Sequence, residues 1–401
     1  MRQGEVMRSS ARRGFTLTCL LVLLVASLPV MGQAQPAPFS STALCSSMDE
    51  LAFDGDQANA SVAWQVNLGP RTPGSNASAE LRATISTDLE ALGYDVSTQT
   101  HQRYGMELTN LFARWSSPET GNGQLVLSAH YDSRSVADQD ENESNRTQPV
   151  PGANDAASGV AVLLELARHI PTMGLDHDVV LFFNDAEDQP PRYTLGAEAW
   201  AENLTDDEIN ATHAFVLLDM VGDADLQLHD VEPGNATLKS RVVELASSLG
   251  LVAESIGCDG HEGLDVLQYD TTINIVDDHI HAHNLGIPAI DLMDTSYGEP
   301  MQYTLGSYWH TLEDTPDKVS ATSLNHVGRL VELGLRTNAF VGINPNEGAE
   351  TNETATDTSS EGDEGSDNDE ARGSPRLALM AFVGLVAILG LLFTVEWKGK
   401  P

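Results

Sequence analysis

The sequence predicts an α/β fold with a mostly parallel central sheet that helices cover on both faces. Short apolar runs of the kind found in strands buried on both faces occur at residues 124–129, 179–183, 214–218 and 287–292. Helix-like segments lie at residues 78–92, 159–169 and 238–249. Because strand-like and helix-like segments alternate along the chain, the sheet should be mainly parallel.

The length and charge of the chain limit the kind of protein it can be. Its 401 residues are enough for one large domain or two ordinary ones. The formal net charge is −38, from 21 Lys and Arg residues against 59 Asp and Glu residues. Nucleic acids and anionic lipid surfaces both require a basic partner face. The composition therefore argues against nucleic acid as a partner.

Residues 1–34 predict a signal peptide. Several arginines precede an apolar run from Phe15 to about Met31, and small residues follow at Gly32 and Ala34. A basic start, a short apolar stretch and a small-residue exit are typical of secretory signals. An uncleaved anchor helix is the alternative interpretation of the same segment.

A second apolar segment predicts a membrane anchor. Residues 377–395 contain no charged side chain, and a helix of that length spans about 28 Å, close to the thickness of the hydrocarbon core. The acidic residues 346–376 are rich in Ser, Thr and Gly, which predicts a disordered tether. We expect a folded domain at 35–345, a cytoplasmic tail at 396–401, and a single-pass protein of the cell membrane whose domain is extracellular.

Two cysteines follow the predicted signal peptide, Cys45 and Cys258. They are either one disulfide, as an oxidising compartment would allow, or two unrelated free thiols. The sequence leaves both alternatives open. Neither the number nor the spacing of the cysteines supports a zinc site made of thiolates.

Side chains able to bind a metal follow three of the predicted strands. Ligands of open parallel sheets bind outside the carboxyl ends of the strands, so we expect these groups to meet at one edge of the sheet. They are His130 and Asp132 after the first apolar run, Asp185, Glu187 and Asp188 after the second, and Asp219 after the third.

Two further segments supply similar groups. Asp155 lies among small residues at the start of a predicted helix, where glycine and alanine neighbours allow the backbone to approach a metal closely. His310 adds a second imidazole. Taken singly, an Asp in so acidic a chain is more often simply solvated, and the joint pattern carries the hypothesis. The candidate metal ligands are His130, Asp155, Asp188, Asp219 and His310.

Imidazole together with carboxylate oxygen suits Zn²⁺ and leaves coordination positions open for water or substrate. Five ligands are more than one catalytic zinc uses. If Asp155 bridges two ions, His130 and Asp219 hold one, while Asp188 and His310 hold the other.

Two more carboxylates have expected roles in this arrangement. Asp132 is placed to accept the second ring N–H of His130 and so to orient that imidazole. Glu187, adjacent to a candidate ligand, is the candidate general base that takes a proton from a metal-activated water.

These segments resemble metallopeptidase family 28, the zinc aminopeptidase and glutaminyl cyclase group. The resemblance extends from about Leu68 to Arg329, and it implies a mixed, mostly parallel sheet of the zinc-exopeptidase type. It places the family's ligands on the five residues named above and the family's base on Glu187. Its most specific segments are AHYDS at 129–133, GANDAASG at 152–159, DAED at 185–188, LDM at 218–220 and WHT at 309–311.

The resemblance implies two competing chemistries. Aminopeptidases hydrolyse the first peptide bond of a peptide with two zinc ions. Glutaminyl cyclases use one zinc, which Asp155, Asp188 and His310 would hold here, and close an N-terminal glutamine onto its own side-chain amide. Features of the cyclase branch are residues 133–138 and the Asp-Asp-His segment that begins at Asp277. In a cyclase Glu187, Asp219 and Asp277 would shuttle protons.

The chain also departs from the family pattern. Asp188 stands where many relatives have the longer Glu, and residues 189–193 replace a loop that carries a pocket tryptophan in animal cyclases. The alternating histidines at His279, His281 and His283 are either a surface metal site or, as we favour, a polar loop near the cleft in which one of the histidines faces inward.

We therefore predict a zinc exopeptidase of the aminopeptidase type that acts on extracellular peptides. The alternatives are a glutaminyl-peptide cyclotransferase and, from a different class, a non-catalytic receptor or adhesion ectodomain. The presence of Glu187 beside a complete ligand set argues against the last. The sequence leaves open the preferred N-terminal residue, the oligomeric state and shedding of the ectodomain.

Overall fold

The computed structural model describes residues 39–344. The helices of this part are α1 (Ser41–Ser47), α2 (Gly55–Asn67), α3 (Asn76–Ala91), α4 (Ala157–His169), α5 (Leu195–Asn203), α6 (Asp206–Ala211), α7 (Ala236–Ser248), α8 (His279–Asn284) and α9 (Ala321–Arg336). The strands are β1 (Asp95–Arg103), β2 (Met106–Trp115), β3 (Gln124–His130), β4 (Asp178–Asn184), β5 (Asp188–Gln189), β6 (Arg192–Tyr193), β7 (Thr212–Asp219), β8 (Leu228–Glu232), β9 (Leu267–Asn274) and β10 (Ala289–Met293). Short 3₁₀ turns lie at Met48–Glu50, Ile170–Thr172 and Pro316–Lys318.

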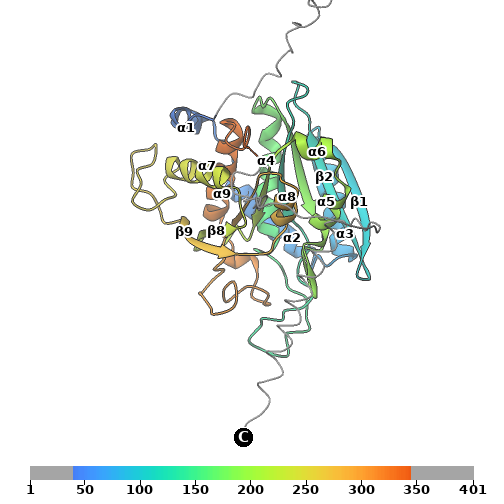
Figure 1. The fold of residues 1–401 in the computed structure, drawn as a ribbon. Coiled ribbons are helices and arrows are strands. Elements are labelled where there is room, and N and C mark those ends of the chain that lie inside the picture. Colours follow the sequence, from blue (N-terminus) through green and yellow to red (C-terminus); the bar gives the residue numbers. More distant parts are fainter. Residues whose placement is uncertain (1–38, 345–401) are drawn as a thin grey trace, which may run out of the picture. The chain divides into compact units, whose positions relative to one another are not determined.

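The central sheet has six strands in the order β1-β2-β4-β3-β7-β10 within the described residues. Strands β4, β3, β7 and β10 run parallel, whereas the β1–β2 hairpin pairs antiparallel with β4. The hairpin forms one edge of the sheet (Figure 1). The sheet is therefore mixed and mostly parallel, as predicted.

Helices pack on both faces of this sheet because the parallel strands are apolar on both. On one face, Leu127, Leu181 and Val216 belong to the larger core cluster, which includes residues of α2, α3, α4 and α9. On the opposite face, Phe182 and Phe215 pack with Trp200 of α5 and with Ala282 of α8. Every residue of β3 is buried, so the functional groups at its end are held by a rigid strand.

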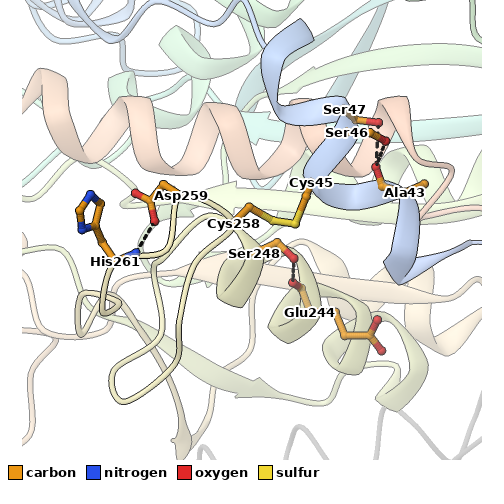
Figure 2. The surroundings of a disulfide bond; sticks show 9 residues. All are labelled: Ala43, Cys45, Ser46, Ser47, Glu244, Ser248, Cys258, Asp259 and His261. Carbon is orange, nitrogen blue, oxygen red and sulfur yellow. Dashed lines mark hydrogen bonds between the residues drawn. A yellow bond between two sulfur atoms is a disulfide. The ribbon is translucent and has the colours of Figure 1, made fainter.

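A disulfide joins Cys45 of α1 to Cys258, 213 residues further along the chain (Figure 2). Of the two alternatives that the sequence left open, the structure therefore has the disulfide. It connects α1 to the loop after α7, near Ser248 at the end of that helix (Figure 2). Two small sheets lie apart from the central one within the described residues. Strands β8 and β9 form a parallel pair, and β5 and β6 form an antiparallel pair.

The predicted strands and helices are confirmed to within a few residues, since β3, β4, β7, β10, α3, α4 and α7 occupy the expected segments. The β1–β2 hairpin was missed. Most of β1 is exposed, so it lacks the apolar run that marks a buried strand. Helix α9 was also not predicted, although its buried Leu324, Val327 and Val331 have helical spacing.

The expectation of a polar loop at the alternating histidines was wrong. Residues 279–284 form helix α8, in which Ala282 packs against the sheet and His279 is fully buried. Residues two apart on a helix point in directions about 200° apart, so the three histidines do not share one face. His279 faces inward, and His281 contacts the Thr194 hydroxyl at 2.8 Å.

No helix among residues 39–344 is long and apolar enough to cross a membrane. The predicted signal peptide at 1–34, the tether at 346–376 and the predicted span at 377–395 all lie outside the described residues.

Glu332 of α9 fixes the segment that precedes α2. This carboxylate is fully buried and accepts hydrogen bonds from the backbone N–H groups of Ala52 and Phe53 at 2.9–3.0 Å. Arg336, one turn further along α9, pairs with the same carboxylate at 2.9 Å. The Glu332 carboxylate therefore accepts the hydrogen bonds that these N–H groups would otherwise make with water.

Replacing Glu332 by alanine should lower the free energy of unfolding by roughly 3 kcal/mol, because the buried N–H of Phe53, the part-buried N–H of Ala52 and a guanidinium lose a charged acceptor. Urea unfolding followed by circular dichroism measures the change. The exposed Glu90 of α3 is the matched control, and Glu90→Ala should change stability by less than about 0.5 kcal/mol. Equal stabilities for the two variants would contradict this role of Glu332.

Candidate active site

The predicted ligands come together at the carboxyl ends of the parallel strands. His130 is the last residue of β3, and Asp219 is the last residue of β7. Asp155 lies in the loop before α4, two residues from the first helical residue. The Nε2 atom of His130 is 3.1 Å from Oδ1 of Asp219 and 3.2 Å from Oδ1 of Asp155. These three buried residues form the first subsite.

A second group of ligands shares Asp155 with the first. Asp188 is the first residue of β5, after the short turn that follows β4. His310 lies in the long loop before α9. The Nε2 atom of His310 is 3.2 Å from Oδ1 of Asp188 and 3.6 Å from Oδ2 of Asp155. Asp155, Asp188 and His310 therefore form the second subsite, and Asp155 offers one oxygen to each.

The spacing of these atoms fits zinc. Ligand atoms bound about 2.0 Å from one tetrahedral zinc ion are about 3.3 Å apart, and the imidazole–carboxylate separations here are 3.1–3.6 Å. Oδ1 of Asp155 and Oδ2 of Asp188 are buried and have no hydrogen-bond partner. Buried acceptors without partners are costly, and a bound cation would satisfy both. The residues present thus fit the zinc ions that the sequence predicts.

Two buried groups hold the loop that carries Asp155. Arg71 is fully buried and donates hydrogen bonds to the carbonyl oxygens of Pro151 and Gly152. Its burial lowers the pKa of the guanidinium to about 10, and the nearby Asp314 opposes that change. Asp314 accepts hydrogen bonds from the backbone N–H groups of Asn154, at 2.8 Å, and of Asp155, at 3.3 Å.

Asp132 sits behind the first subsite, at the position that the sequence predicted. Its Oδ1 is 3.5 Å from Nδ1 of His130, the ring nitrogen that points away from Asp155 and Asp219. The same carboxylate accepts the backbone N–H groups of Glu187 at 3.0 Å and Asp188 at 3.2 Å. Asp132 therefore links the orientation of His130 to the turn that presents the candidate base.

Glu187, the candidate general base, is buried beside both subsites. Burial raises its pKa well above the ordinary value, and although His130 lowers it, the carboxylates of Asp188 and Asp219 raise it further. The preceding residue, Ala186, has a left-handed backbone with φ = 60°. A non-glycine residue in that region is strained, and this turn sets the direction of the Glu187 side chain.

Asp277, the predicted proton carrier, is buried close to this group. Burial raises its pKa well above the ordinary value, and so do the nearby Asp291, Asp219 and Glu187. Ligand atoms of Asp277, His279 and Asp291 lie within 4.8 Å of one another. The structure thus brings Asp277 into the electrostatic field of the candidate base.

Several residues that surround the second subsite have no role that the sequence predicted. Arg134 and Asp138 lie within the segment 133–138, which was noted only for its resemblance to cyclases. Arg134 donates a hydrogen bond to Asp188, and Asp138 lies 3.6 Å from Nδ1 of His310. The sequence signal for these two residues was an Arg and an Asp four positions apart, shortly after the strand that ends at His130. Such a pair is common in any acidic chain.

A comparison with protein families places this arrangement. The model for peptidase family M28 matches residues 110–333, which is more than half of the chain. The chain belongs to peptidase family M28. Aminopeptidase YwaD of Bacillus subtilis is 27% identical over 207 residues, covering 52% of this chain but only 39% of that enzyme. The chain thus spans well under half the length of this curated M28 relative.

Solved structures of M28-like proteins cover most of the chain. A Zn-dependent exopeptidase from Parabacteroides distasonis is 28% identical with a TM-score of 0.60, over 72% of this chain and 99% of its own. The glutaminyl cyclase of Porphyromonas gingivalis is also 28% identical with a TM-score of 0.60, over 71% and 98% of the two chains. The fold is of zinc-exopeptidase type, and overall likeness does not separate the two chemistries.

The sharing of Asp155 makes a prediction about metal content. Asp155→Asn should weaken zinc binding at both subsites, whereas Asp219→Asn and Asp188→Asn should each weaken one. Loss of a ligand should cost more than the roughly 10–100-fold in affinity that loss of a ligand's outer partner costs. Zinc per chain is measured by atomic emission after dialysis at fixed free zinc. An Asp155→Asn protein that loses no more metal than Asp219→Asn would show that Asp155 is not shared.

Proposed function

We propose that this M28 protein is a zinc-dependent aminopeptidase that hydrolyses the N-terminal peptide bond of extracellular peptides. The observation that carries the proposal is the pair of ligand groups that share Asp155. Two adjoining metal subsites suit the hydrolytic branch, in which metal ions activate a water and polarise the substrate carbonyl. His130 and Asp219 would complete one subsite, and Asp188 and His310 the other.

The chain's own residues supply the proton transfers. Glu187 takes a proton from the attacking water as the water oxygen bonds to the carbonyl carbon, and it gives that proton to the leaving amine nitrogen as the C–N bond breaks. Its burial removes competing water, so the carboxylate interacts strongly with the reacting groups. Asp132 holds the turn that positions Glu187 through the backbone N–H of that residue.

A specific observation favours a second candidate, glutaminyl cyclisation. Asp277, Asp278 and Asp291 lie buried near Glu187, and burial raises the pKa of each above its ordinary value. Carboxyl groups that keep their protons can pass them between the substrate amine and a leaving ammonia. In this alternative the second subsite holds the single zinc, and Asp219 carries protons with Glu187 and Asp277.

We also propose that the domain works outside the cell and is attached to the membrane by residues 377–395. The Cys45–Cys258 disulfide supports an oxidising compartment. The basic and apolar segment at 1–34 supports export. Peptides are the expected substrates because the chain belongs to a peptidase family, and the net charge of −38 disfavours nucleic acids as partners.

One assay separates the two chemistries. A peptide that begins with glutamine is incubated with the zinc-loaded protein, and its products are analysed by mass spectrometry together with an ammonia assay. Hydrolysis releases free glutamine and a peptide one residue shorter, whereas cyclisation releases ammonia and leaves every residue in the chain. We expect hydrolysis, together with cleavage of leucine arylamides. Ammonia release with no shortened peptide would show that the activity is cyclisation and would contradict the aminopeptidase proposal.

Glu187→Gln should lower kcat by roughly 10²–10⁴-fold, because the amide has the same shape but cannot accept a proton at neutral pH. Zinc content and thermal unfolding should stay close to those of the wild type, since Glu187 is not a proposed ligand. Turnover of the leucine arylamide and zinc per chain are measured on the same preparation. Full activity in a zinc-loaded Glu187→Gln protein would remove the assigned base.

A further inference from the structure

The guanidinium of Arg134 lies against a proposed zinc ligand. Its Nη1 donates a hydrogen bond to Oδ1 of Asp188 at 2.5 Å, and only 2% of the Arg134 residue is exposed. Nε and Nη2 donate to the two oxygens of Asp138 at 2.8 and 2.7 Å. The Tyr193 hydroxyl, 3.2 Å from Nη2, and the Tyr193 ring cover the outer side of the guanidinium. Arg134 is thus held on three sides in one position.

Asp138 extends this contact to the other ligand of the second subsite. Its Oδ1 is 3.6 Å from Nδ1 of His310, the ring nitrogen opposite the one that faces Asp155 and Asp188. The backbone of the same loop is tied to the His310 loop, because Gln139 N–H donates to the His310 carbonyl at 3.3 Å. One ion pair, Arg134–Asp138, therefore hydrogen-bonds an aspartate of the subsite and places a carboxylate 3.6 Å behind its histidine, whose Nδ1 has no hydrogen-bond partner among the described residues.

The contact leaves the second oxygen of Asp188 free. Oδ1 accepts the hydrogen bond of Arg134 and is also the oxygen that lies 3.2 Å from Nε2 of His310, whereas Oδ2 is buried and has no hydrogen-bond partner within residues 39–344. An aspartate side chain is short and rotates about two bonds, so a fixed hydrogen bond on one oxygen fixes where the other oxygen points. Arg134 therefore determines the direction in which Asp188 can offer a ligand atom.

The first subsite has no comparable contact. Among residues 39–344, no arginine or lysine forms a hydrogen bond or ion pair with His130 or Asp219, and the contacts of His130 are with Asp132, Asp155 and Asp219. The two subsites consequently differ in their surroundings, although they share Asp155.

We propose that Arg134 is a positioning residue for the second subsite, which orients Asp188 toward the metal and holds the Asp138 carboxylate behind His310. This inference rests on the proposed function, because it concerns the affinity of the zinc ion that Asp155, Asp188 and His310 hold. Removal of such outer partners typically costs 10–100-fold in metal affinity. The opposite effect is competition: Oδ1 is the Asp188 oxygen nearest Nε2 of His310, and if Arg134 opposed zinc at that oxygen, removing Arg134 would tighten zinc binding.

The experiment measures metal affinity without reference to turnover. The full chain is stripped of metal and titrated with Zn²⁺ against a chromophoric chelator, and separately with Co²⁺, whose visible spectrum reports the geometry of its ligands. We expect Arg134→Ala to lower the affinity of one subsite by about 10–100-fold, to change the Co²⁺ spectrum of that subsite, and to leave the other subsite unchanged. Arg134→Lys, which keeps the charge but not the planar fork, should restore part of the affinity.

Three controls make the result specific. Arg168→Ala removes an exposed arginine of α4 and should leave both affinities unchanged. Tyr193→Phe keeps the ring over the guanidinium and removes only the hydroxyl contact, so it should have a small effect. Thermal unfolding of the metal-free proteins separates loss of a ligand position from loss of the fold. If Arg134→Ala fails to fold, Arg134→Lys decides the question by its spectrum and affinity.

Zinc affinities that are equal, or tighter, in Arg134→Ala than in the wild type would overturn the inference. A loss at the first subsite instead of the second, identified by comparison with Asp219→Asn, would overturn it as well. A wild-type chain that binds no zinc would instead contradict the proposed function, so the two failures are distinguishable.

Discussion

The site depends on one electrostatic constraint, which is the burial of many acidic groups around two imidazoles at a single edge of the sheet. Asp155, Asp188 and Asp219 are each almost fully buried, and Glu187 and Asp277 are buried beside them. Buried carboxylates that lack partners are expensive by several kcal/mol per charge. The protein can keep these charged groups buried only if cations or protons neutralise them. The imidazole–carboxylate separations of 3.1–3.6 Å match those of ligand atoms around a tetrahedral zinc ion.

This constraint explains the layer of polar residues around the ligands. Arg71 and Asp314 fix the loop of Asp155, and Asp132 fixes the turn at Glu187 and lies 3.5 Å behind Nδ1 of His130. Each of these groups is itself buried, so its position is set by packing as well as by hydrogen bonds. Such a layer keeps like charges close together in the absence of metal and reduces the reorganisation needed when metal binds.

The part of the molecule that the sequence predicted well is the part governed by local patterns. Strands β3, β4 and β7 have continuous apolar runs, and their ends therefore located His130 and Asp219 before the fold was known. Asp155 was found in the same way, from its small-residue loop. Here residue type and element type point to the same answer, which is the usual sign of a well-specified structure.

The rest depended on tertiary contacts that leave little trace in the sequence. The β1–β2 hairpin is polar on its exposed side, so only its pairing with β4 shows that it belongs to the sheet. Arg134 is indistinguishable in the sequence from any surface arginine, and only the fold shows that it is buried against Asp188. The histidines of α8 were assigned to a polar loop because three histidines in so short a segment are polar, whereas the burial of Ala282 and His279 against the sheet selects a helix.

In the proposed function, the choice between hydrolysis and cyclisation would follow from how the first subsite is neutralised. The pKa values of the buried Asp278 and Asp291 respond to the charges of His130 and Asp219, and that of Asp277 responds to Asp219. If a second zinc occupies the first subsite, Asp219 is a ligand, its charge is used by the metal, and water activation becomes available. If protons neutralise the same carboxylates, Asp219 and Asp277 become a proton relay beside Glu187, and the single zinc of the second subsite suffices. One set of side chains could therefore serve either chemistry, and we propose that occupancy of the first subsite by metal or by protons would be the physical difference between them.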